Sequence, residues 1–477
     1  MQNANPKVGV LFNLGGPGRN RTTDTRIFNP LLYQLSYQAK TEKYSSVKKL
    51  CKGFLKNSFQ APFIMRSMTS NAQLHTSSSA AAGTDICIVG DGAVGKAAAL
   101  GLAQAGFKVT LLAPPARAAA KDEASWDVRV YALNHTAHRL LSSVRVWEAM
   151  DAERIAPVDN MTVHGDGLSE KAQPGFLSFD AYAARTSALA WIIEDRNLDQ
   201  ALDAALRFAP NVRVVQGRAN ALSVSPEAAT LTLESGQTIS APLLVGADGA
   251  NSWVRGQCDI GLDYRAYNQQ AIVTNFSCEK PHLGVAYQWF SPTEGVIALL
   301  PLPGERVSLV WSAPQALAEQ LLRLPLSELA ARLAQWADPV LGALAPLQPE
   351  VAKSFPLRLI KPHAMIDQRV ALIGDAAHVV HPMAGHGMNL GFGDVATLID
   401  TLVNREPQYD CGDSRVLRRY ARARKEEVLL MQVATDGLNR IFSTEAEPVR
   451  LVRNLGMNLL NHLPVLKRRL IAHALGK

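Results

Sequence analysis

The stretch RVALIGDAAHVVHPMAGHGMNLGFGD, residues 369–394, decides the fold. It begins with the apolar run 370–373, turns at Gly374 and Asp375, crosses a glycine-rich loop, and resumes as a helical pattern from about Met388. This order predicts a strand, a loop and a helix. A helix that begins after glycines presents free backbone N–H groups and the positive end of its dipole, so the stretch predicts a site for an anionic group. Strands also end at Gly-Asp in plain connections, so other parts of the chain have to support this interpretation.

Length and composition limit the class of protein. The chain has 477 residues, which predicts two or three domains. Its five cysteines are scattered and lack the spacing of a metal site, so we expect reduced thiols in a cytoplasmic protein and no metal site. No apolar run reaches the roughly 18 residues of a membrane span, and the start lacks the apolar core of a signal peptide. These features predict a protein that neither spans a membrane nor is secreted.

The net charge of +7 is unevenly distributed along the chain. Residues 1–83 hold eleven Lys and Arg against two acidic residues, a charge of +9, which leaves 7 − 9 = −2 for the remainder. The body of the protein therefore has no charge pattern that predicts nucleic-acid binding.

Three interpretations of residues 1–83 stay open. The basic, acid-poor composition fits an organelle transit peptide or a functional basic arm. In the third interpretation, the segment is a non-native extension translated across the antisense strand of a phenylalanine transfer-RNA gene, and the true start is Met65 or Met68. Three stretches can be encoded by the complements of the T arm, anticodon loop and D arm of such a gene, in that order: 18–22, 27–29 and 31–37. We favour this interpretation and expect the extension to be disordered and without function.

The pattern of a dinucleotide-binding unit follows the N-terminal segment. The apolar run 86–89 predicts a buried strand, and a Gly-x-Gly-x-x-Gly turn formed by Gly90, Gly92 and Gly95 comes directly after it. An Ala- and Leu-rich helical pattern then leads to a second apolar strand, 108–112. Glycines at these positions allow a tight turn, the close approach of a pyrophosphate and close packing of helix on strand.

One expected residue of this unit is missing. An acidic side chain usually ends the second strand and accepts hydrogen bonds from the adenosine ribose, but the residue here is Ala113. Losing a charged acceptor weakens binding by roughly 1–3 kcal/mol. We therefore predict weak retention of the cofactor on purification, with Arg129 as the candidate residue that compensates.

A further strand-to-glycine corner occurs at Gly246, Ala247, Asp248 and Gly249, just before a helix start. By itself, this corner is equally well explained as a plain turn at Asp-Gly. Three such corners in one chain are harder to explain as connections, and they favour one ligand held by all three.

Together, the three corners resemble those of the FAD-dependent aromatic hydroxylases, the single-component flavoprotein monooxygenases. Their order and spacing agree over residues 84–400. Further stretches resemble the ubiquinone-biosynthesis hydroxylase branch of that family and extend the resemblance to residue 456. These stretches are 286–290, Gly295, 299–302, 310–312, 420–425, 435–438 and 453–456.

The resemblance implies an α/β fold with two domains in an α+β arrangement. A Rossmann-like FAD-binding domain would be interleaved with a mixed β-sheet substrate domain and followed by a helical C-terminus. The expected FAD-binding domain comprises residues 84–160, 185–262 and 354–400, the substrate domain residues 161–184 and 263–353, and the helical C-terminal region residues 401–477.

The resemblance also implies a set of cofactor-binding residues. The expected set is Gly90, Gly92, Ala93, Val94, Gly95, Arg129, Asp248, Gly249, Gly374, Asp375, Gly385, His386, Gly387, Met388 and Asn389. The first glycine corner would hold the pyrophosphate of FAD, Arg129 would lie near its adenosine, and Asp375 would bind its ribityl or pyrophosphate portion. Asp248 and Gly249 resemble a motif that contacts both FAD and a transient reduced nicotinamide, and residues 385–389 would line the isoalloxazine ring.

Position 386 departs from the family pattern, which usually has Gln where this chain has His386. A titratable group there would either tune the flavin or simply fill space. We favour the second interpretation.

The implied reaction is reduction of FAD by NADPH or NADH, followed by transfer of an oxygen atom from O2 to an activated aromatic ring. Because the cofactor carries this chemistry, few side chains are expected to be catalytic. The candidates are Pro382, whose carbonyl would lie near the reacting edge of the flavin, and His378. His378 and His381 are the candidate bases, with a structural role as the alternative for each.

Alternating apolar and polar residues predict a substrate sheet of antiparallel strands over 270–278, 286–290, 296–300 and 307–311. The residues expected near its pocket are Tyr287, Trp289, Phe290 and Trp311. Such an apolar pocket suits a polyprenyl phenol or quinol, although aromatic residues on strands commonly belong to the core. The leading hypothesis is hydroxylation of the ring of a polyprenylated ubiquinone precursor. A hydroxylase of a soluble aromatic compound and a catalytically weak scaffold of a quinone-biosynthesis complex are the alternatives.

The C-terminal stretch 451–475 has apolar residues at helical spacing together with basic residues. Such a helix either rests on anionic lipid or packs on the body of the protein with a solvated charged face. We slightly favour peripheral contact with a membrane, because a polyprenyl substrate resides there. The expected location is cytoplasmic, or peripheral to the inner face of the membrane.

Overall fold

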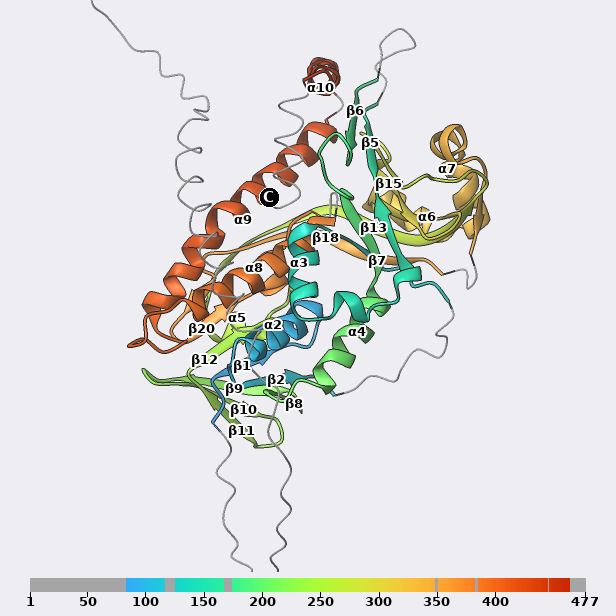
Figure 1. Cartoon of the computed structure of the whole chain (residues 1–477). Helices are drawn as coiled ribbons and strands as arrows, with labels where there is room; N and C mark the ends of the chain where they lie inside the picture. Colours follow the sequence, from blue (N-terminus) through green and yellow to red (C-terminus); the bar gives the residue numbers. More distant parts are fainter. Residues whose placement is uncertain are drawn as a thin grey trace, which may run out of the picture. The chain divides into compact units, whose positions relative to one another are not determined.

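The computed structural model of the chain describes residues 83–115, 125–166, 174–347, 351–381, 385–444 and 446–463 (Figure 1). The predictions for the N-terminal extension and for Pro382 lie outside these residues, as does the part of the predicted membrane-contacting tail beyond residue 463. The backbone of His386 is described, whereas its side chain is not.

A six-stranded sheet forms the predicted dinucleotide-binding half. Its order is β19–β20–β12–β1–β2–β8, and all neighbouring strands are parallel except β19 and β20. The strands are β1 (Ile86–Val89), β2 (Val109–Ala113), β8 (Val212–Gln216), β12 (Leu243–Gly246), β19 (Ile366–Asp367) and β20 (Val370–Leu372). The central strands β1, β12 and β20 are buried along their whole length, as parallel strands covered on both faces should be. The strands predicted at 86–89, 108–112 and 370–373 are confirmed to within one residue.

Helices cover one face of this sheet, and a small sheet covers the other. The helices are α2 (Ala93–Gln104), α3 (His135–Ser143), α4 (Asp195–Arg207) and α8 (His386–Val403), and their apolar side chains share a core with the strands. The opposite face packs against the antiparallel strands β9 (Ala219–Val224), β10 (Ala229–Leu233) and β11 (Thr238–Ala241) and the short helix α5 (Trp253–Gln257). Because α2 and α8 contact each other, the helices that follow the first and last glycine corners lie side by side.

A second, eight-stranded sheet forms the predicted substrate side. Its order is β17–β13–β16–β15–β14–β5–β6, with β18 paired to β13. The strands are β5 (Asn160–His164), β6 (Phe176–Asp180), β13 (Leu262–Cys278), β14 (Val285–Ser291), β15 (Gly295–Leu302), β16 (Arg306–Pro314), β17 (Leu344–Pro346) and β18 (Lys353–Pro362). All neighbours are antiparallel except β14 and β5, so the sheet is mixed, as predicted. Helices α6 (Gln315–Leu321) and α7 (Leu326–Leu341) cover one of its faces.

The predicted domain boundaries stay a prediction, and the described residues are organised around these two sheets. Between them lies a three-stranded antiparallel sheet of β3 (Val130–Leu133), β7 (Ala190–Glu194) and β4 (Ile155–Val158). The substrate sheet also reaches further along the chain than the predicted boundary at residue 353, because β18 pairs with β13 up to Pro362.

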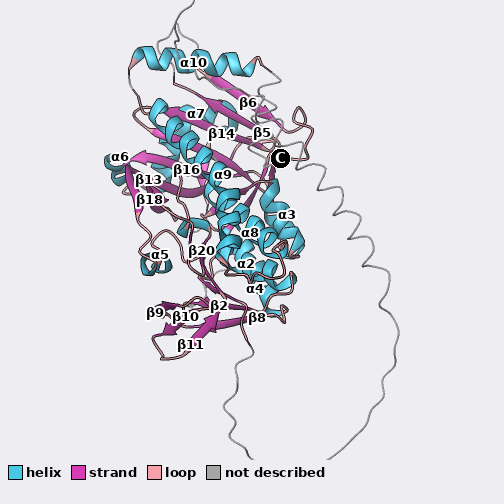
Figure 2. Ribbon diagram, turned by 90° about the vertical axis from the view of Figure 1, so that its left-hand side faces the viewer, coloured by secondary structure: helices cyan, strands magenta, loops and turns pink. Residues whose placement is uncertain are grey.

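Two helices follow α8, namely α9 (Ser414–Phe442) and α10 (Glu447–Asn461), in agreement with the predicted helical C-terminus. Helix α9 packs along α8, and α10 lies above β6 across the end of α9 (Figure 2). Within the described ranges, no helix combines the length and the apolar character needed to cross a membrane.

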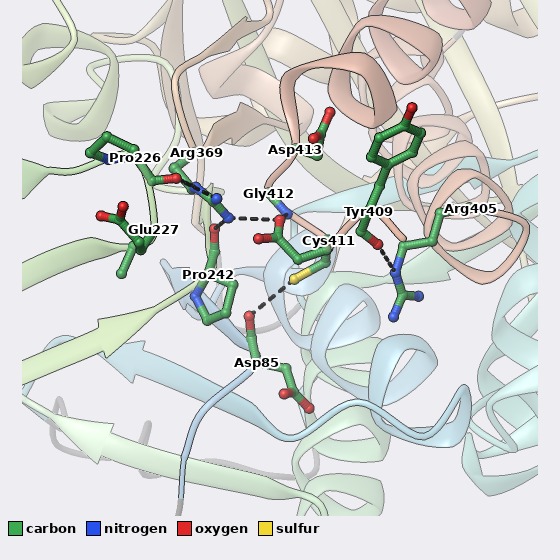
Figure 3. A network of polar contacts seen from close by, with 12 residues as sticks. Asp85, Pro226, Glu227, Pro242, Arg369, Arg405, Tyr409, Cys411, Gly412 and Asp413 are labelled. Carbon is green, nitrogen blue, oxygen red and sulfur yellow. Dashed lines mark hydrogen bonds and ion pairs between the residues drawn. The ribbon is translucent and has the colours of Figure 1, made fainter. Parts of the chain in front are cut away.

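A polar network attaches the turn between α8 and α9 to the amino ends of β1, β12 and β20 in the six-stranded sheet (Figure 3). Arg369 donates to the carbonyls of Pro226 and Pro242, the latter at 3.2 Å, and pairs with Asp410 at 2.6 Å. The Cys411 thiol donates to the carbonyl oxygen of Asp85 at 3.3 Å, and burial raises the pKa of this thiol to about 12. These contacts fix where α9 starts relative to the sheet.

Candidate active site

The three predicted corners meet at the carboxyl ends of the strands of the six-stranded sheet. They follow β1, β12 and β20, which are adjacent and parallel, so their carboxyl ends lie together. The backbone N–H of Ala247 donates to the carbonyl of Val89 at 2.8 Å, and that of Ile373 donates to Gly246 at 2.9 Å. Ligands of open α/β sheets bind at such an edge.

At positions 90 and 95, the first corner is so tight that only glycine fits. A Cβ atom on Gly95 would lie 2.0 Å from the carbonyl oxygen of Gly90, and one on Gly90 would lie 2.4 Å from that of Ala247. Gly90 also has φ +112°, a conformation that other residues rarely adopt. Val94 packs against the third corner, because a Cβ on Gly374 would lie 3.2 Å from the Val94 side chain.

The start of α2 fits an anionic group. Its N-cap residue, Gly92, supplies no side-chain cap, and the first turn contains no acidic residue. The first-turn N–H groups of Ala93, Val94 and Gly95 therefore keep their hydrogen-bonding capacity for a ligand. The space beside Gly92 is also open, because a Cβ there would meet nothing within 4 Å. The corner that contains the five predicted residues thus offers backbone donors beside an open space, as a pyrophosphate site requires, and their contact with FAD stays a prediction.

Asp375 and Arg129 lie at the same edge as interacting charges. One side of Asp375 is open to solvent, and protein surrounds its carboxyl on the other sides. This burial raises the pKa of its carboxyl, and His378, Arg129 and Arg358 partly offset the effect. The Arg129 guanidinium lies 3.8 Å from Asp195 and 5.3 Å from the centre of the Tyr131 ring.

Asp248 uses both of its carboxylate oxygens within its own corner. They accept from the Ser252 hydroxyl at 2.5 Å and from the backbone N–H of Val254 at 3.0 Å. The second bond satisfies an N–H group in the first turn of α5. The predicted contact of Asp248 with FAD and nicotinamide stays a prediction. Arg255, to which the sequence pattern assigned no role, is buried and donates to the carbonyls of Ala250 and Ala376. It therefore ties the second corner to the third.

His378 belongs to a buried network of charges. Its Nε2 lies 2.7 Å from Asp394, which also accepts from Arg424 at 2.7 Å and from the backbone N–H of Gly374 at 2.9 Å. Burial alone would raise the pKa of the Asp394 carboxyl, but His378 and Arg424 hold it below its usual value. Because His378 is only 2% exposed, this geometry favours a structural role over the predicted catalytic one. Asp394 and Arg424 had no predicted role, since nothing in the helical pattern shows that they meet.

His381 has a different environment. It is fully buried where the third corner reaches the substrate sheet, and its Nε2 lies 3.0 Å from the Gln269 side-chain oxygen. The edge of its ring meets Tyr267 at 4.9 Å between centroids, and its Nδ1 has no hydrogen-bond partner within the described structure. Burial lowers the pKa of His381 to about 4, so the ring is neutral at neutral pH. Because Gln269 offers an acceptor, Nε2 carries the proton and Nδ1 is left as an acceptor.

The start of α8 is held in place by Asn389. Its side chain accepts from the backbone N–H of Asn134 at 2.9 Å and donates to the carbonyls of Ala132 and Gly385 at 2.8 and 3.1 Å. Gly385 has φ +68° and supplies no side-chain cap, so the first-turn N–H groups that follow it keep their hydrogen-bonding capacity. Of the residues predicted to line the flavin ring, Asn389 therefore acts through the backbone it fixes, whereas the contacts of His386, Gly387 and Met388 stay predictions.

Three of the four aromatic residues predicted near the substrate pocket are core residues instead. Tyr287, Trp289 and Trp311 point to the face of the sheet that α6 and α7 cover. The reason is the alternation of a strand, which turns every second side chain to the same face. Phe290 lies on the other face, where its ring stacks on Phe442 at 3.8 Å.

The opposite face of this sheet is the accessible one. Ala298 and Val310 are partly exposed in central strands, whereas Leu309 and Trp311 beside them are fully buried. Gln288, Ala298 and Val310 are cross-strand neighbours on this face. The wall around Ala298 and Val310 is small and apolar, and the same face carries buried polar side chains: Asn275, Gln288, Ser308 and Ser312.

Comparison with known proteins places this geometry in context. Residues 83–431 match the model of the family described as FAD binding domain. The chain is 36% identical to 3-demethoxyubiquinol 3-hydroxylase of Escherichia coli, over 82% of this chain and 98% of the relative. It is also 36% identical to ubiquinone hydroxylase UbiL of Rhodospirillum rubrum, over 82% and 89%. With the mitochondrial ubiquinone biosynthesis monooxygenase COQ6 of Drosophila melanogaster, the identity is 31% over 86% and 93%.

Solved structures share the fold. The crystal structure of PqsL, a probable FAD-dependent monooxygenase from Pseudomonas aeruginosa, matches with a TM-score of 0.64 and 21% identity, covering 79% of this chain and 99% of that one. That of p-nitrophenol 4-monooxygenase PnpA from Pseudomonas putida matches with a TM-score of 0.63 and 17% identity, covering 82% and 98%. At these identities, the likeness supports the fold alone.

Proposed function

The chain belongs to the FAD-binding-domain family of flavoprotein monooxygenases, in the branch of the ubiquinone-biosynthesis hydroxylases, and from this premise we propose that it hydroxylates the aromatic ring of a polyprenylated quinone precursor. Its cofactor is FAD, and NADPH or NADH is the reductant. The observation that carries the proposal is the meeting of three glycine corners at one sheet edge, beside a second sheet with an accessible apolar face.

Reduced FAD, when bound, supplies the activation of O2 and the oxygen atom that enters the ring. The chain's own residues bind and orient. The N–H groups at the start of α2 hold the pyrophosphate, and Arg129 and Asp375 fix the polar part of the cofactor. Arg255 and Asn389 keep the corners in register through their bonds to backbone carbonyls.

The substrate ring is expected between the flavin corner and the accessible face of the substrate sheet. His381 Nδ1 is a buried acceptor that has no partner among the described residues, and it lies at the junction of these two parts. A phenolic hydroxyl that donates to this nitrogen would be oriented by it, and the ring would become richer in electrons. The apolar wall around Ala298 and Val310 suits a prenyl chain more than an ionic substrate, which supports a polyprenyl phenol or quinol over a soluble aromatic acid.

The proposal is tested with purified protein, both as the whole chain and starting at Met65. FAD, NADPH or NADH, and a short-tailed polyprenyl phenol are added, and the oxidation of reductant and the mass of the product are followed. We expect oxidation that the phenol stimulates and a product with one added oxygen. A soluble aromatic substrate would be indicated if only untailed phenols stimulate oxidation, and a scaffold if the protein binds no added FAD.

Two further parts of the proposal concern partners and location. Peripheral contact with a membrane would give access to a lipid-soluble substrate, and membership of a quinone-biosynthesis complex would pass the product to the next enzyme. Co-purification of the tagged protein from membrane and soluble fractions, with its quinone intermediates identified by mass spectrometry, tests both.

A further inference from the structure

Helix α10 turns its polar side inward and its apolar side outward. On the inner side, Asn458 and Asn461 accept from the backbone N–H groups of Phe176 and Ser178 at 2.8 and 3.2 Å, and Asn454 donates to the carbonyl of Asp166 at 2.7 Å. These bonds attach α10 to β6, an edge strand of the substrate sheet. A helix on the surface of a soluble protein normally has the opposite orientation.

The outer side of α10 is a continuous apolar face. Four large residues at helical spacing lie on it, and their exposed fractions are 56%, 70%, 68% and 60% for Leu451, Val452, Leu455 and Leu459. About the last four turns of α9 add further exposed apolar residues: Leu429, Leu430, Val433, Leu438 and Ile441. Exposed apolar patches of this extent mark a contact with a partner or a membrane.

The first half of α9 carries a stripe of positive charge on its exposed side. Arg415, Arg418, Arg422 and Lys425 follow one another at spacings of three and four residues and line a hollow of about 450 Å³. Among the described residues, none of these four side chains forms an ion pair, and Glu426 is the single acidic neighbour on this side of the helix. Four like charges on one helix face repel one another, so the stripe favours an external anion.

The undescribed ends of the chain do not supply that anion. Residues 464–477 contain four Lys and Arg and no Asp or Glu, and residues 1–82 have a charge of +9. By composition, neither end has the net negative charge that would complement the stripe. A partner from outside the chain therefore has to be both apolar and negatively charged.

We propose that the outer face of α10 and the apolar end of α9 rest in the surface of an anionic lipid bilayer, with the four basic side chains of α9 at the level of the phosphate groups. An anionic bilayer offers an apolar layer next to a negative one, which matches the two parts of this surface. The choice of lipid over an acidic protein rests on the proposed function, because a prenylated substrate resides in the bilayer.

The test measures binding of the full chain to vesicles, without turnover. Vesicles of phosphatidylcholine alone are compared with vesicles that also contain phosphatidylglycerol, at low and high salt. We expect binding to the anionic vesicles that salt weakens, because exposed charges are screened. Equal binding to both kinds of vesicle, or binding to neither, would overturn the proposal.

Two variants separate the apolar from the charged part. Leu455→Glu with Leu459→Glu should lower the affinity for anionic vesicles at least tenfold. Changing the four basic residues of the stripe to Gln should lower it by about fivefold per residue. Because all these residues are exposed, the thermal stability of both variants should match that of the unchanged chain.

Matched controls exclude a general effect of surface change. Phe208 is 86% exposed on a different element, at the end of α4, and Arg419 on α9 is paired with Glu406. Phe208→Glu and Arg419→Gln should bind vesicles as the unchanged chain does. If the surface instead joins two copies of the chain, the protein will be a dimer without lipid and the α10 variant a monomer, which would contradict the proposal.

The assay with a short-tailed phenol is run on the same proteins. If the proposed function is wrong, no variant shows oxidation stimulated by the phenol, although vesicle binding follows the pattern above. If only the docking surface is wrong, the oxidation remains and the pattern of vesicle binding is absent.

Discussion

Helices α8 and α10 both attach to the protein through polar side chains, yet they turn opposite faces to it. In α8, Asp394 and Asn389 point inward together with the apolar residues Phe392 and Leu398, and the hydrogen bonds of these two polar side chains hold the backbone at Gly374 and Gly385. In α10, asparagines point inward and leucines outward. The inward polar residues of α8 and α10 therefore have two different roles. In α8 they fix the corners that we propose to hold the flavin, and in α10 they leave the apolar face exposed.

The largest effect is expected for Asp394→Asn. The change leaves His378 and Arg424 buried beside a neutral group, and breaking a buried ion pair costs about 3–5 kcal/mol. Chemical denaturation should show this loss, and FAD should bind more weakly because Gly374 loses its partner. Glu427→Gln is the control, since Glu427 is the half-exposed partner of the same Arg424 and should cost less than about 1 kcal/mol. Equal effects of the two changes would remove the distinction between α8 as a buried anchor and a surface helix.

The next effect concerns pH and His381, at the approach to α8. Its pKa is near 4 in the folded protein and 6.5 ordinarily, so below pH 6.5 the unfolded chain takes up a proton that the folded one does not. Stability is therefore fully present above pH 6.5 and is lost as the pH falls toward 4, by on the order of 3 kcal/mol. Urea unfolding of the unchanged chain and of His381→Gln at several pH values should give a shallower acid decline for the variant. Parallel curves would contradict this role.

Asp394 contributes to pH dependence with its own window. Because its pKa is lowered from 3.8, its stabilisation is complete above that pH and disappears as the pH falls further. The Asp394→Asn variant should therefore lose the part of the acid decline below about pH 4 while keeping the part caused by His381. Unfolding curves of the two single variants and the double variant, compared pairwise, check this division.

Restoring the missing acid tests the cofactor end of the site. Ala113 ends β2 and is 7% exposed, at the edge where the glycine corners meet. Ala113→Glu should tighten FAD binding by roughly 1–3 kcal/mol if its carboxylate reaches the ribose hydroxyls. Ala113→Gln, which has the same length without the charge, is the control. Fluorescence titration of the apoprotein with FAD measures the difference, and equal affinities of the two variants would show that the charge has no role here.

The smallest effects on stability belong to α10, where the inverted orientation makes an unusual prediction. Asn458→Ala removes a bond to the edge strand β6 and should cost about 1 kcal/mol, whereas Leu455→Ser on the outer face should cost less than about 0.5 kcal/mol. In a helix with normal orientation the order is reversed. A larger loss for the leucine change would show that the outer face is covered within the chain itself.

The parts of the molecule that depend on backbone were predictable from the sequence. The corners at Gly90, Gly246 and Gly374 stand beside apolar runs, and parallel strands in one sheet bring their ends together whatever the side chains are. The parts that depend on long-range side-chain contacts were not. Arg255 meets the carbonyl of Ala376 from 121 residues away and Arg424 meets Asp394 from 30 residues away, and nothing local marks them as buried.

The substrate sheet shows the same limit at shorter range. Alternation located its strands correctly, but it does not indicate which of the two faces a helix will cover. Tyr287, Trp289 and Trp311 were therefore predicted near a pocket, with the core as the common alternative, and the structure packs them against the core that α6 and α7 cover.

The central claim is that the corners hold one flavin that delivers an oxygen atom to a substrate on the accessible face of the second sheet. Mass spectrometry of the product formed under isotopically labelled dioxygen tests it most directly. We predict one labelled oxygen atom in the ring hydroxyl for each NADPH or NADH that the phenol causes to be oxidised. A product without label, or oxidation that yields only hydrogen peroxide with every tailed and untailed phenol, would contradict it.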